Sequence, residues 1–119
     1  MILVDDDFIF RQAIGRLLRS NGFGVIAFER PSDVLLSSLP RSAACLMIDV
    51  NMPEMHGVEL CHALEAKGIR LPTILITGYP GQHVETYAEE VGAVALLFKP
   101  LEATELFHAI ETALKQSVA

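Results

Sequence analysis

Short apolar runs alternate along the chain with longer segments in which apolar and polar residues mix. Five of these runs, rich in β-branched residues, predict β-strands over Ile2–Val4, Val25–Phe28, Cys45–Val50, Thr73–Thr77 and Val94–Phe98. The third and fourth runs are apolar almost throughout, which is typical of strands whose two faces are both buried under helices. The alternation therefore predicts βαβ units built around a parallel sheet.

The mixed segments repeat apolar residues at the spacing i, i+3, i+4, i+7 of a helix with one core-facing side. The repeats are Phe10, Ala13, Ile14 and Leu17; Val84, Tyr87, Ala88 and Val91; and Ala103, Leu106, Phe107 and Ile110. Shorter helices are expected after Pro31, which suits a first helical turn, and after Gly57. Five strands and five helices in strict alternation predict one α/β domain over residues 1–119, a doubly wound five-stranded parallel sheet.

Composition narrows the classes of partner. The net charge is −6, from nine basic and fifteen acidic residues, and no basic stripe is present, so nucleic-acid binding by this domain alone is not expected. The apolar runs are too short to span a bilayer and no signal peptide precedes the first strand, which predicts a cytoplasmic protein without a membrane contact. Cys45 and Cys61 lie among apolar residues and are expected to be buried hydrophobes rather than a redox or zinc pair.

Polar residues gather where the predicted strands end, which is where a doubly wound sheet binds its ligands. Asp5 and Asp6 follow the first strand, Asp49 lies in the tail of the third, Thr77 ends the fourth and Lys99 follows the fifth. Asp49 stands in the apolar stretch LMIDV, where a carboxylate without partners would be costly to bury. We therefore expect these side chains to meet at one edge of the sheet.

Three carboxylates at contact distance repel each other, so the cluster persists only if a cation or a shifted protonation state offsets it. Asp5, Asp6 and Asp49 offer hard oxygen ligands that suit Mg²⁺ or Mn²⁺, and Lys99 adds an ammonium. A carboxylate kept ionised in this way is a nucleophile toward phosphorus, and Lys99 with the Thr77 hydroxyl would receive the phosphoryl oxygens. The predicted product is an aspartyl phosphate on Asp49, which could draw Thr77 inward and bias a two-state surface.

The four motifs VDDD, IDVNMPEMHG, ITG and FKP occur in this order. Together they resemble the response-regulator receiver domain of bacterial two-component signalling, over nearly the whole chain. The resemblance implies a flavodoxin-like sheet of order 2-1-3-4-5. It also implies the following roles: Asp5 and Asp6 as the metal-binding pair, with Asp6 the direct ligand, Asp49 as the phosphoacceptor, the backbone carbonyl of Asn51 as a further metal ligand, and Thr77 and Lys99 as contacts of the phosphoryl group.

The same resemblance implies partners and a signalling face. The phosphodonor would be a histidine kinase or a histidine phosphotransfer protein, and the chain would be no enzyme beyond its own phosphorylation and dephosphorylation. Output would pass through the fourth helix, fifth strand and fifth helix, to an output domain or by homodimerisation. Leu96 takes a switch position that is usually Tyr or Phe, which makes this face fairly apolar, and the bond before Pro100 is expected to be cis.

Three other functions stay open at this point. A flavodoxin-like module would need a Ser, Thr or Gly loop after the first strand to hold the FMN phosphate, where this chain has three aspartates. A haloacid-dehalogenase-like phosphatase would need a second Asp two residues after the nucleophile, where Asn51 stands. A pseudo-receiver without phosphorylation is favoured only by Leu96. Asp7 is expected to cap the first helix, and no catalytic role is expected for His56, His62, His83 or His108.

Overall fold

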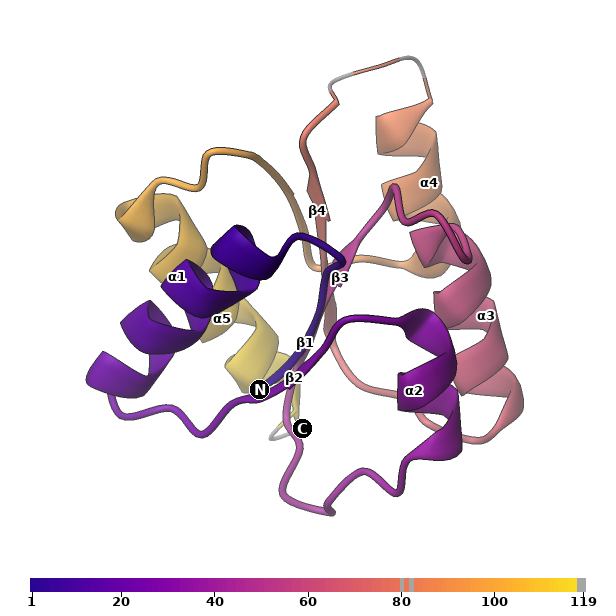
Figure 1. Cartoon of the computed structure of the whole chain (residues 1–119), viewed down its shortest axis with the longest axis horizontal. Coiled ribbons are helices and arrows are strands. Elements are labelled where there is room, and N and C mark those ends of the chain that lie inside the picture. The colour runs from indigo at the N-terminus through magenta and orange to yellow at the C-terminus, as the bar shows by residue number, and fades with distance from the viewer. Residues whose placement is uncertain (80, 82, 118–119) are drawn as a thin grey trace.

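The five apolar runs form one parallel sheet, seen nearly edge-on in Figure 1. The computed structural model describes residues 1–79, 81 and 83–117. The strands are β1 (Ile2–Val4), β2 (Ile26–Phe28), β3 (Leu46–Asp49), β4 (Thr73–Thr77) and β5 (Ala95–Phe98). Their order in the sheet is β2-β1-β3-β4-β5, so the expected order 2-1-3-4-5 is confirmed. All five strands point the same way, and their carboxyl ends therefore share one edge of the sheet.

Helices cover both faces of the sheet (Figure 1). Their bounds are α1 (Phe8–Ser20), α2 (Pro31–Leu36), α3 (Gly57–Ala66), α4 (Val84–Val91) and α5 (Ala103–Ser117). α1 and α5 pack on one face, while α2, α3 and α4 pack on the other. This is the doubly wound α/β architecture that the alternation of strands and helices predicted.

The core is split by the sheet because successive strand residues point to opposite faces. Leu3 and Met47 pack with α1 and α5, whereas Ile2 and Ile48 pack with α2, α3 and α4. Asp49 follows Ile48, so its side chain lies at the end of the sheet on the α1 and α5 side. The alternation of side chains along each strand thus determines the face of the sheet on which the side chain at the strand end lies.

The apolar stripes of two helices differ in detail from the prediction. Ala13 and Ala103 are exposed, and Leu18, Ala109 and Ala113 are buried in their helices instead. Alanine has little apolar area to remove from water, so a single alanine hardly fixes the rotation of a helix. The predicted stripe of α4 is confirmed, with Val84 buried.

Helix ends and cysteines follow the expectations. The Asp7 carboxylate caps α1 by accepting a hydrogen bond from the Phe10 amide at 3.2 Å. Cys45 and Cys61 are free thiols that pack on opposite faces of the sheet, and burial raises their pKa values to about 12 and about 11. No helix in the described part of the chain has the length and apolar character to cross a membrane.

The face formed by α4, β5 and α5 is less apolar than the sequence suggested. Leu96 is half-buried under α4, and the outward positions of α4 include the exposed Glu85, Glu89 and Glu90. Among the described residues, Phe98 is the one large apolar side chain on these three elements that counts as exposed. The apolar positions of α4 face the core, which leaves acids on its solvent side.

Candidate functional site

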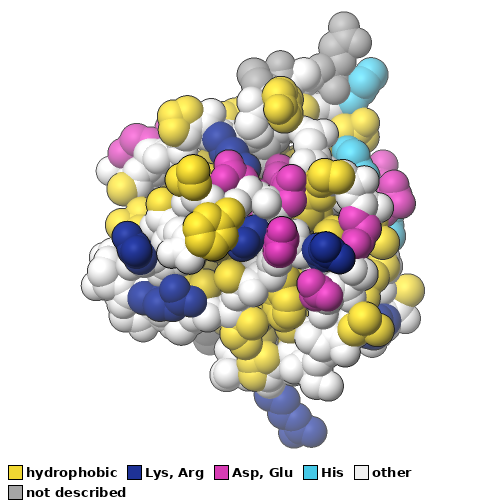
Figure 2. All heavy atoms as spheres, viewed as in Figure 1, with side chains coloured by type: hydrophobic (Ala, Val, Ile, Leu, Met, Phe, Trp, Pro, Cys, Tyr) yellow, Lys and Arg dark blue, Asp and Glu magenta, His cyan; other side chains and the backbone are white. Residues whose placement is uncertain are grey.

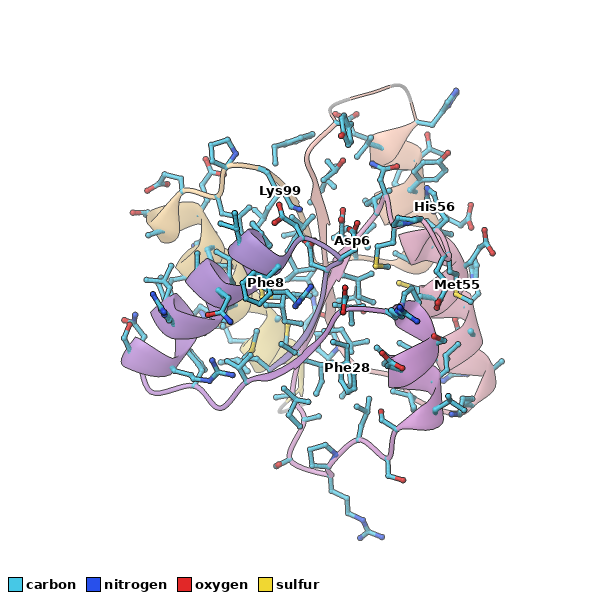
Figure 3. All side chains as sticks on the ribbon, viewed as in Figure 1. Asp6, Phe8, Phe28, Met55, His56 and Lys99 are labelled. Atoms are coloured by element: carbon cyan, nitrogen blue, oxygen red, sulfur yellow. The ribbon has the colours of Figure 1, made fainter. Side chains whose placement is uncertain are left out.

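Four of the five strands, β1, β3, β4 and β5, each deliver one polar group to the same edge of the sheet. β3 ends in Asp49 and β4 ends in Thr77, while Asp5 directly follows β1 and its amide donates to Phe28 O at 3.1 Å. Lys99 directly follows β5, and its amide donates to Thr77 O at 2.8 Å. Figure 3 shows Asp6 and Lys99 at this edge, with Phe8 on the α1 side and His56 on the α3 side.

The acidic cluster consists of Asp5, Asp6 and Asp49. Each offers a carboxylate oxygen, and the three oxygens lie within 4.8 Å of one another. Asp5 and Asp49 are buried, whereas Asp6 is exposed. Asp5 Oδ1 accepts a hydrogen bond from the Asp7 amide at 2.8 Å, but no described residue gives the buried Oδ2 a hydrogen bond of normal geometry. A buried carboxylate oxygen with spare acceptor capacity beside two further carboxylates fits a cation of the Mg²⁺ type.

The ammonium of Lys99 reaches into the cluster. Its Nζ lies 2.8 Å from Asp5 Oδ2, 3.8 Å from Asp49 Oδ2 and 4.2 Å from the centre of the Phe10 ring. Burial alone would lower the pKa of Lys99, but the contacts with Asp5 and the charge of Asp49 outweigh burial and raise it. Lys99 is therefore fully charged at neutral pH and holds the two buried acids together.

Asp49 is poised between its two protonation states. Burial, followed by the charge of Asp5, raises the pKa of Asp49 from 3.8 to about 7, although Lys99 opposes the shift. Additional positive charge near Asp49 would favour the ionised carboxylate, which is the nucleophilic form. A bound cation would therefore raise the ionised fraction of Asp49 at neutral pH.

The Thr77 hydroxyl is buried and takes part in a small hydrogen-bond network. Thr77 Oγ1 accepts hydrogen bonds from Asn51 Nδ2 at 3.2 Å and from the Tyr79 amide at 3.1 Å. The backbone amide of Asn51 donates to Asp49 Oδ1 at 3.2 Å. Asn51 thereby links the end of β3 to the end of β4, a role of its side chain that the sequence did not reveal.

These groups border an open pocket of about 360 Å³. It is lined by Asp6, Asp7, Asp49, Asn51, Gly78, Tyr79 and Lys99. Figure 2 shows acidic and basic side chains side by side across the middle of this face, with apolar side chains around them. The pocket leaves Asp49 accessible from solvent although its side chain is largely buried.

Gly57 fixes the loop that follows Asp49. Its amide donates to Val50 O at 2.8 Å, and a Cβ at this position would lie 2.5 Å from Asp49 O and 2.9 Å from Val50 Cα. Any side chain would collide with this backbone, so the start of α3 can press against the end of β3 only because residue 57 is glycine.

Sequence reasoning did not find two neighbours of the cluster. The Phe10 ring lies beside Lys99, and Arg11 Nη1 donates to Asp5 O at 2.8 Å. Both residues stand in the first turns of α1, where the spacing gave Phe10 a core position and Arg11 no role. The Lys99–Pro100 peptide bond is cis, as the resemblance implied.

Comparison with known proteins decides the family. The family model of the response regulator receiver domain matches residues 1–111. The chain belongs to this family. The receiver domain is 35% identical over 116 residues to the transcriptional regulatory protein FixJ of Bradyrhizobium diazoefficiens, and 39% identical over 114 residues to the response regulator protein TodT of Pseudomonas putida.

Solved structures agree with this assignment. The response regulator StyR has a TM-score of 0.89 and 36% identity to this receiver domain, over 98% of this chain and 59% of StyR. FixJ-N has a TM-score of 0.86 and 33% identity, over 96% of this chain and 91% of FixJ-N. The alignments cover 97% and 95% of this chain but only 56% of FixJ and 50% of TodT, so the chain spans about half the length of these relatives.

Proposed function

We propose that this receiver domain accepts a phosphoryl group on Asp49 from a phosphorylated histidine of a kinase or phosphotransfer protein. The observation that carries the proposal is the position of the Asp49 carboxylate. It borders an open pocket, lies within 4.8 Å of Asp5 and Asp6 oxygens, and faces the Lys99 ammonium at 3.8 Å. Phosphoryl transfer to an aspartate is general to the family, which supports the assignment to this residue.

The groups that would hold Mg²⁺ or Mn²⁺ are the carboxylates of Asp5, Asp6 and Asp49, with the backbone carbonyl of Asn51. Three carboxylate oxygens and the spare acceptor capacity of buried Asp5 Oδ2 suit a hard divalent cation. When bound, the cation would supply positive charge that keeps Asp49 ionised and screens the phosphoryl oxygens.

The transfer forms one bond and breaks another. An Asp49 oxygen bonds to phosphorus while the bond from phosphorus to the donor histidine nitrogen breaks, and that nitrogen keeps the electron pair. Lys99 neutralises charge on the phosphoryl oxygens, and the Thr77 hydroxyl exchanges its bond to Tyr79 O for one to a phosphoryl oxygen. Water later hydrolyses the acyl phosphate, so the chemistry is limited to the phosphorylation and dephosphorylation of the chain itself.

A phosphatase of the haloacid-dehalogenase type is less well supported. That reaction requires a carboxylic acid two residues after the nucleophile to protonate the leaving group. Asn51 holds this place, and its amide nitrogen donates to Thr77 Oγ1. An amide cannot serve as the general acid, which favours a phosphoacceptor over a phosphatase.

Exposed apolar side chains at the pocket and next to it in the chain support docking of a protein phosphodonor. Tyr79 lines the pocket, while Phe8 and Phe98 are the chain neighbours of the lining residues Asp7 and Lys99. These three apolar side chains are 75%, 62% and 44% exposed. Exposed apolar patches are typical of protein interaction sites. A cytoplasmic location is part of this proposal, because kinase and receiver have to share a compartment.

The proposal is tested with a small phosphodonor. Incubation with acetyl phosphate and Mg²⁺ is expected to add the mass of one phosphoryl group, read by intact-protein mass spectrometry, and a chelator is expected to prevent it. The Asp49→Asn variant should stay unmodified. The matched control Asp33→Asn, at an exposed position of α2, should react like the wild type. Modification of Asp49→Asn to the wild-type extent, or no modification of the wild type, would contradict the proposal.

A further inference from the structure

The Phe10 ring contacts the Lys99 ammonium, a contact that nothing in the chemistry so far has used. Nζ lies 4.2 Å from the ring centre, well within the range of about 6 Å over which the negative face of an aromatic ring attracts a cation. We propose that Phe10 is a positioning residue for Lys99, whose ring holds the ammonium where it meets the phosphoryl group on Asp49. This inference rests on the proposed phosphoacceptor function.

The ring is held by contacts that do not depend on Lys99. Phe10 is the third residue of α1, and its amide donates to the Asp7 carboxylate that caps the helix. Its side chain is half-buried and packs against the core cluster under α1 and α5. The position of the Phe10 ring is therefore set by α1 and the core and does not depend on Lys99.

The ammonium, in contrast, ends a flexible side chain with competing partners. It lies 1 Å nearer to Asp5 than to Asp49, with distances of 2.8 Å and 3.8 Å. The aliphatic part of the Lys99 side chain passes Gly78, where an added Cβ would lie 3.6 Å from Lys99 Cδ. Because Gly78 has no side chain, it does not hold Lys99 in place. A lysine loses much rotational freedom when its head is held in one place. The Phe10 ring is an uncharged surface that limits the positions that the Lys99 ammonium can take.

An uncharged partner suits a group that has to change its contacts during the reaction. When a phosphoryl group forms on Asp49, Lys99 gains phosphoryl oxygens as partners and gives up part of its contact with Asp5. A third carboxylate in place of the ring would compete with the phosphoryl oxygens for the ammonium. The ring attracts the cation at both stages and leaves its hydrogen-bond donors free.

The test compares three substitutions of phenylalanine. Phe10→Leu removes the aromatic face, and Phe10→Tyr keeps it. The matched control Phe23→Leu removes a ring that packs on the same core cluster but stacks on Phe107, with centroids 6.3 Å apart. The initial rate of phosphorylation by acetyl phosphate, at saturating Mg²⁺, is expected to fall roughly 3- to 30-fold in Phe10→Leu and to stay within about twofold of wild type in the other two variants.

A second readout does not involve the reaction. In the metal-free protein, NMR signals of the Lys99 ε-methylene protons should be shifted upfield by the ring in wild type and Phe10→Tyr, and should lose this shift in Phe10→Leu. A Mg²⁺ titration should give the same affinity for all variants, because the ring touches the ammonium and not the metal-binding carboxylates.

The possible results separate the two proposals. Equal slowing of Phe10→Leu and Phe23→Leu, a parallel loss of Mg²⁺ affinity in Phe10→Leu, or unshifted Lys99 signals in the wild type would overturn the role of Phe10. A reactive wild type with an equally reactive Phe10→Leu would overturn this inference alone. A wild type that takes no phosphoryl group would overturn the proposed function and, with it, this inference.

Discussion

Asp49 has to satisfy two opposing requirements at the scale of a single residue. In the proposed reaction its carboxylate must be ionised to attack phosphorus, yet burial and the neighbouring Asp5 raise its pKa from 3.8 to about 7. Lys99 restores part of the missing positive charge at 3.8 Å. In the proposed reaction, a divalent cation held by Asp5, Asp6 and Asp49 would supply the remaining positive charge and favour the ionised carboxylate.

This balance predicts how pH affects stability. Below pH 4 or so Asp49 is protonated in the folded and unfolded states alike, and it costs nothing. As the pH rises toward 7, only the unfolded state releases the proton readily, so the folded state loses stability. Asp49→Asn is therefore expected to stabilise the metal-free protein at about pH 8, on the order of 1–3 kcal/mol, with a gain that shrinks toward about pH 4.

Urea unfolding in the presence of a chelator measures this difference across the pH range. The exposed Asp33→Asn variant is the control and should show no such gain. A destabilised Asp49→Asn protein at neutral pH, or a gain that grows as the pH falls, would show that burial does not strain this carboxylate.

The sequence allowed some site residues to be placed and not others. Asp5, Asp49, Thr77 and Lys99 could be expected at one edge because each stands at a strand end, and parallel strands end together. The Asn51 amide and the Phe10 ring could not, because their contacts depend on side-chain directions across separate elements. The position of a residue at a strand end can be predicted from the sequence. The direction of its side chain depends on packing against other elements.

At the scale of the elements, α4 ends in a left-handed turn. Gly92 caps the helix with φ +64°, and its amide donates to Glu89 O at 3.1 Å. Glycine adopts this conformation without the steric cost that a Cβ brings. The cap sets where the chain leaves α4 and turns into β5, and thus where β5 begins.

Gly92→Ala is expected to destabilise the protein by about 1 kcal/mol, because alanine is strained at positive φ. Gly24→Ala is the matched control: nothing lies within 4 Å of the added Cβ and its φ is not positive. That variant should unfold at the wild-type urea concentration or slightly above it. Equal midpoints for the two variants would mean that the end of α4 contributes little to stability.

The strands were predictable almost to the residue, whereas the buried faces of α1 and α5 were predicted only in part. Val25, Cys45, Val50 and Val94 flank the strands as the structure has them, because an apolar run does not mark where pairing stops. In α1 and α5 the large residues Ile14, Leu106 and Ile110 were placed correctly, and the alanines were misplaced. Large apolar side chains contribute most of the buried area, so the pattern is accurate where they stand.

For the whole molecule, we propose that phosphorylation acts on partners through the face of α4, β5 and α5, as the resemblance implied. If two copies associate through this face, the exposed Glu85, Glu89 and Glu90 of each copy approach one another. Like charges at an interface repel, and salt screens the repulsion over about 10 Å at 0.1 M. Such a dimer would therefore be strengthened by salt, unlike one held by ion pairs.

We expect the phosphorylated protein to form a dimer whose dissociation constant falls as the salt concentration rises. Sedimentation velocity with and without acetyl phosphate and Mg²⁺ measures this, and Asp49→Asn treated in the same way should remain monomeric. A phosphorylated protein that stays monomeric at every salt concentration would argue against homodimerisation and leave docking to an output domain as the proposed use of this face.

The tight contact at Gly57 has a mechanical consequence. The backbone leaves the sheet at Asp49 and returns to contact it at Gly57. No side chain separates the backbone of Gly57 from that of Asp49 and Val50. A displacement of the start of α3 would therefore act directly on the backbone of Asp49 and Val50. Position 57 thus couples the start of α3 to the proposed phosphoacceptor.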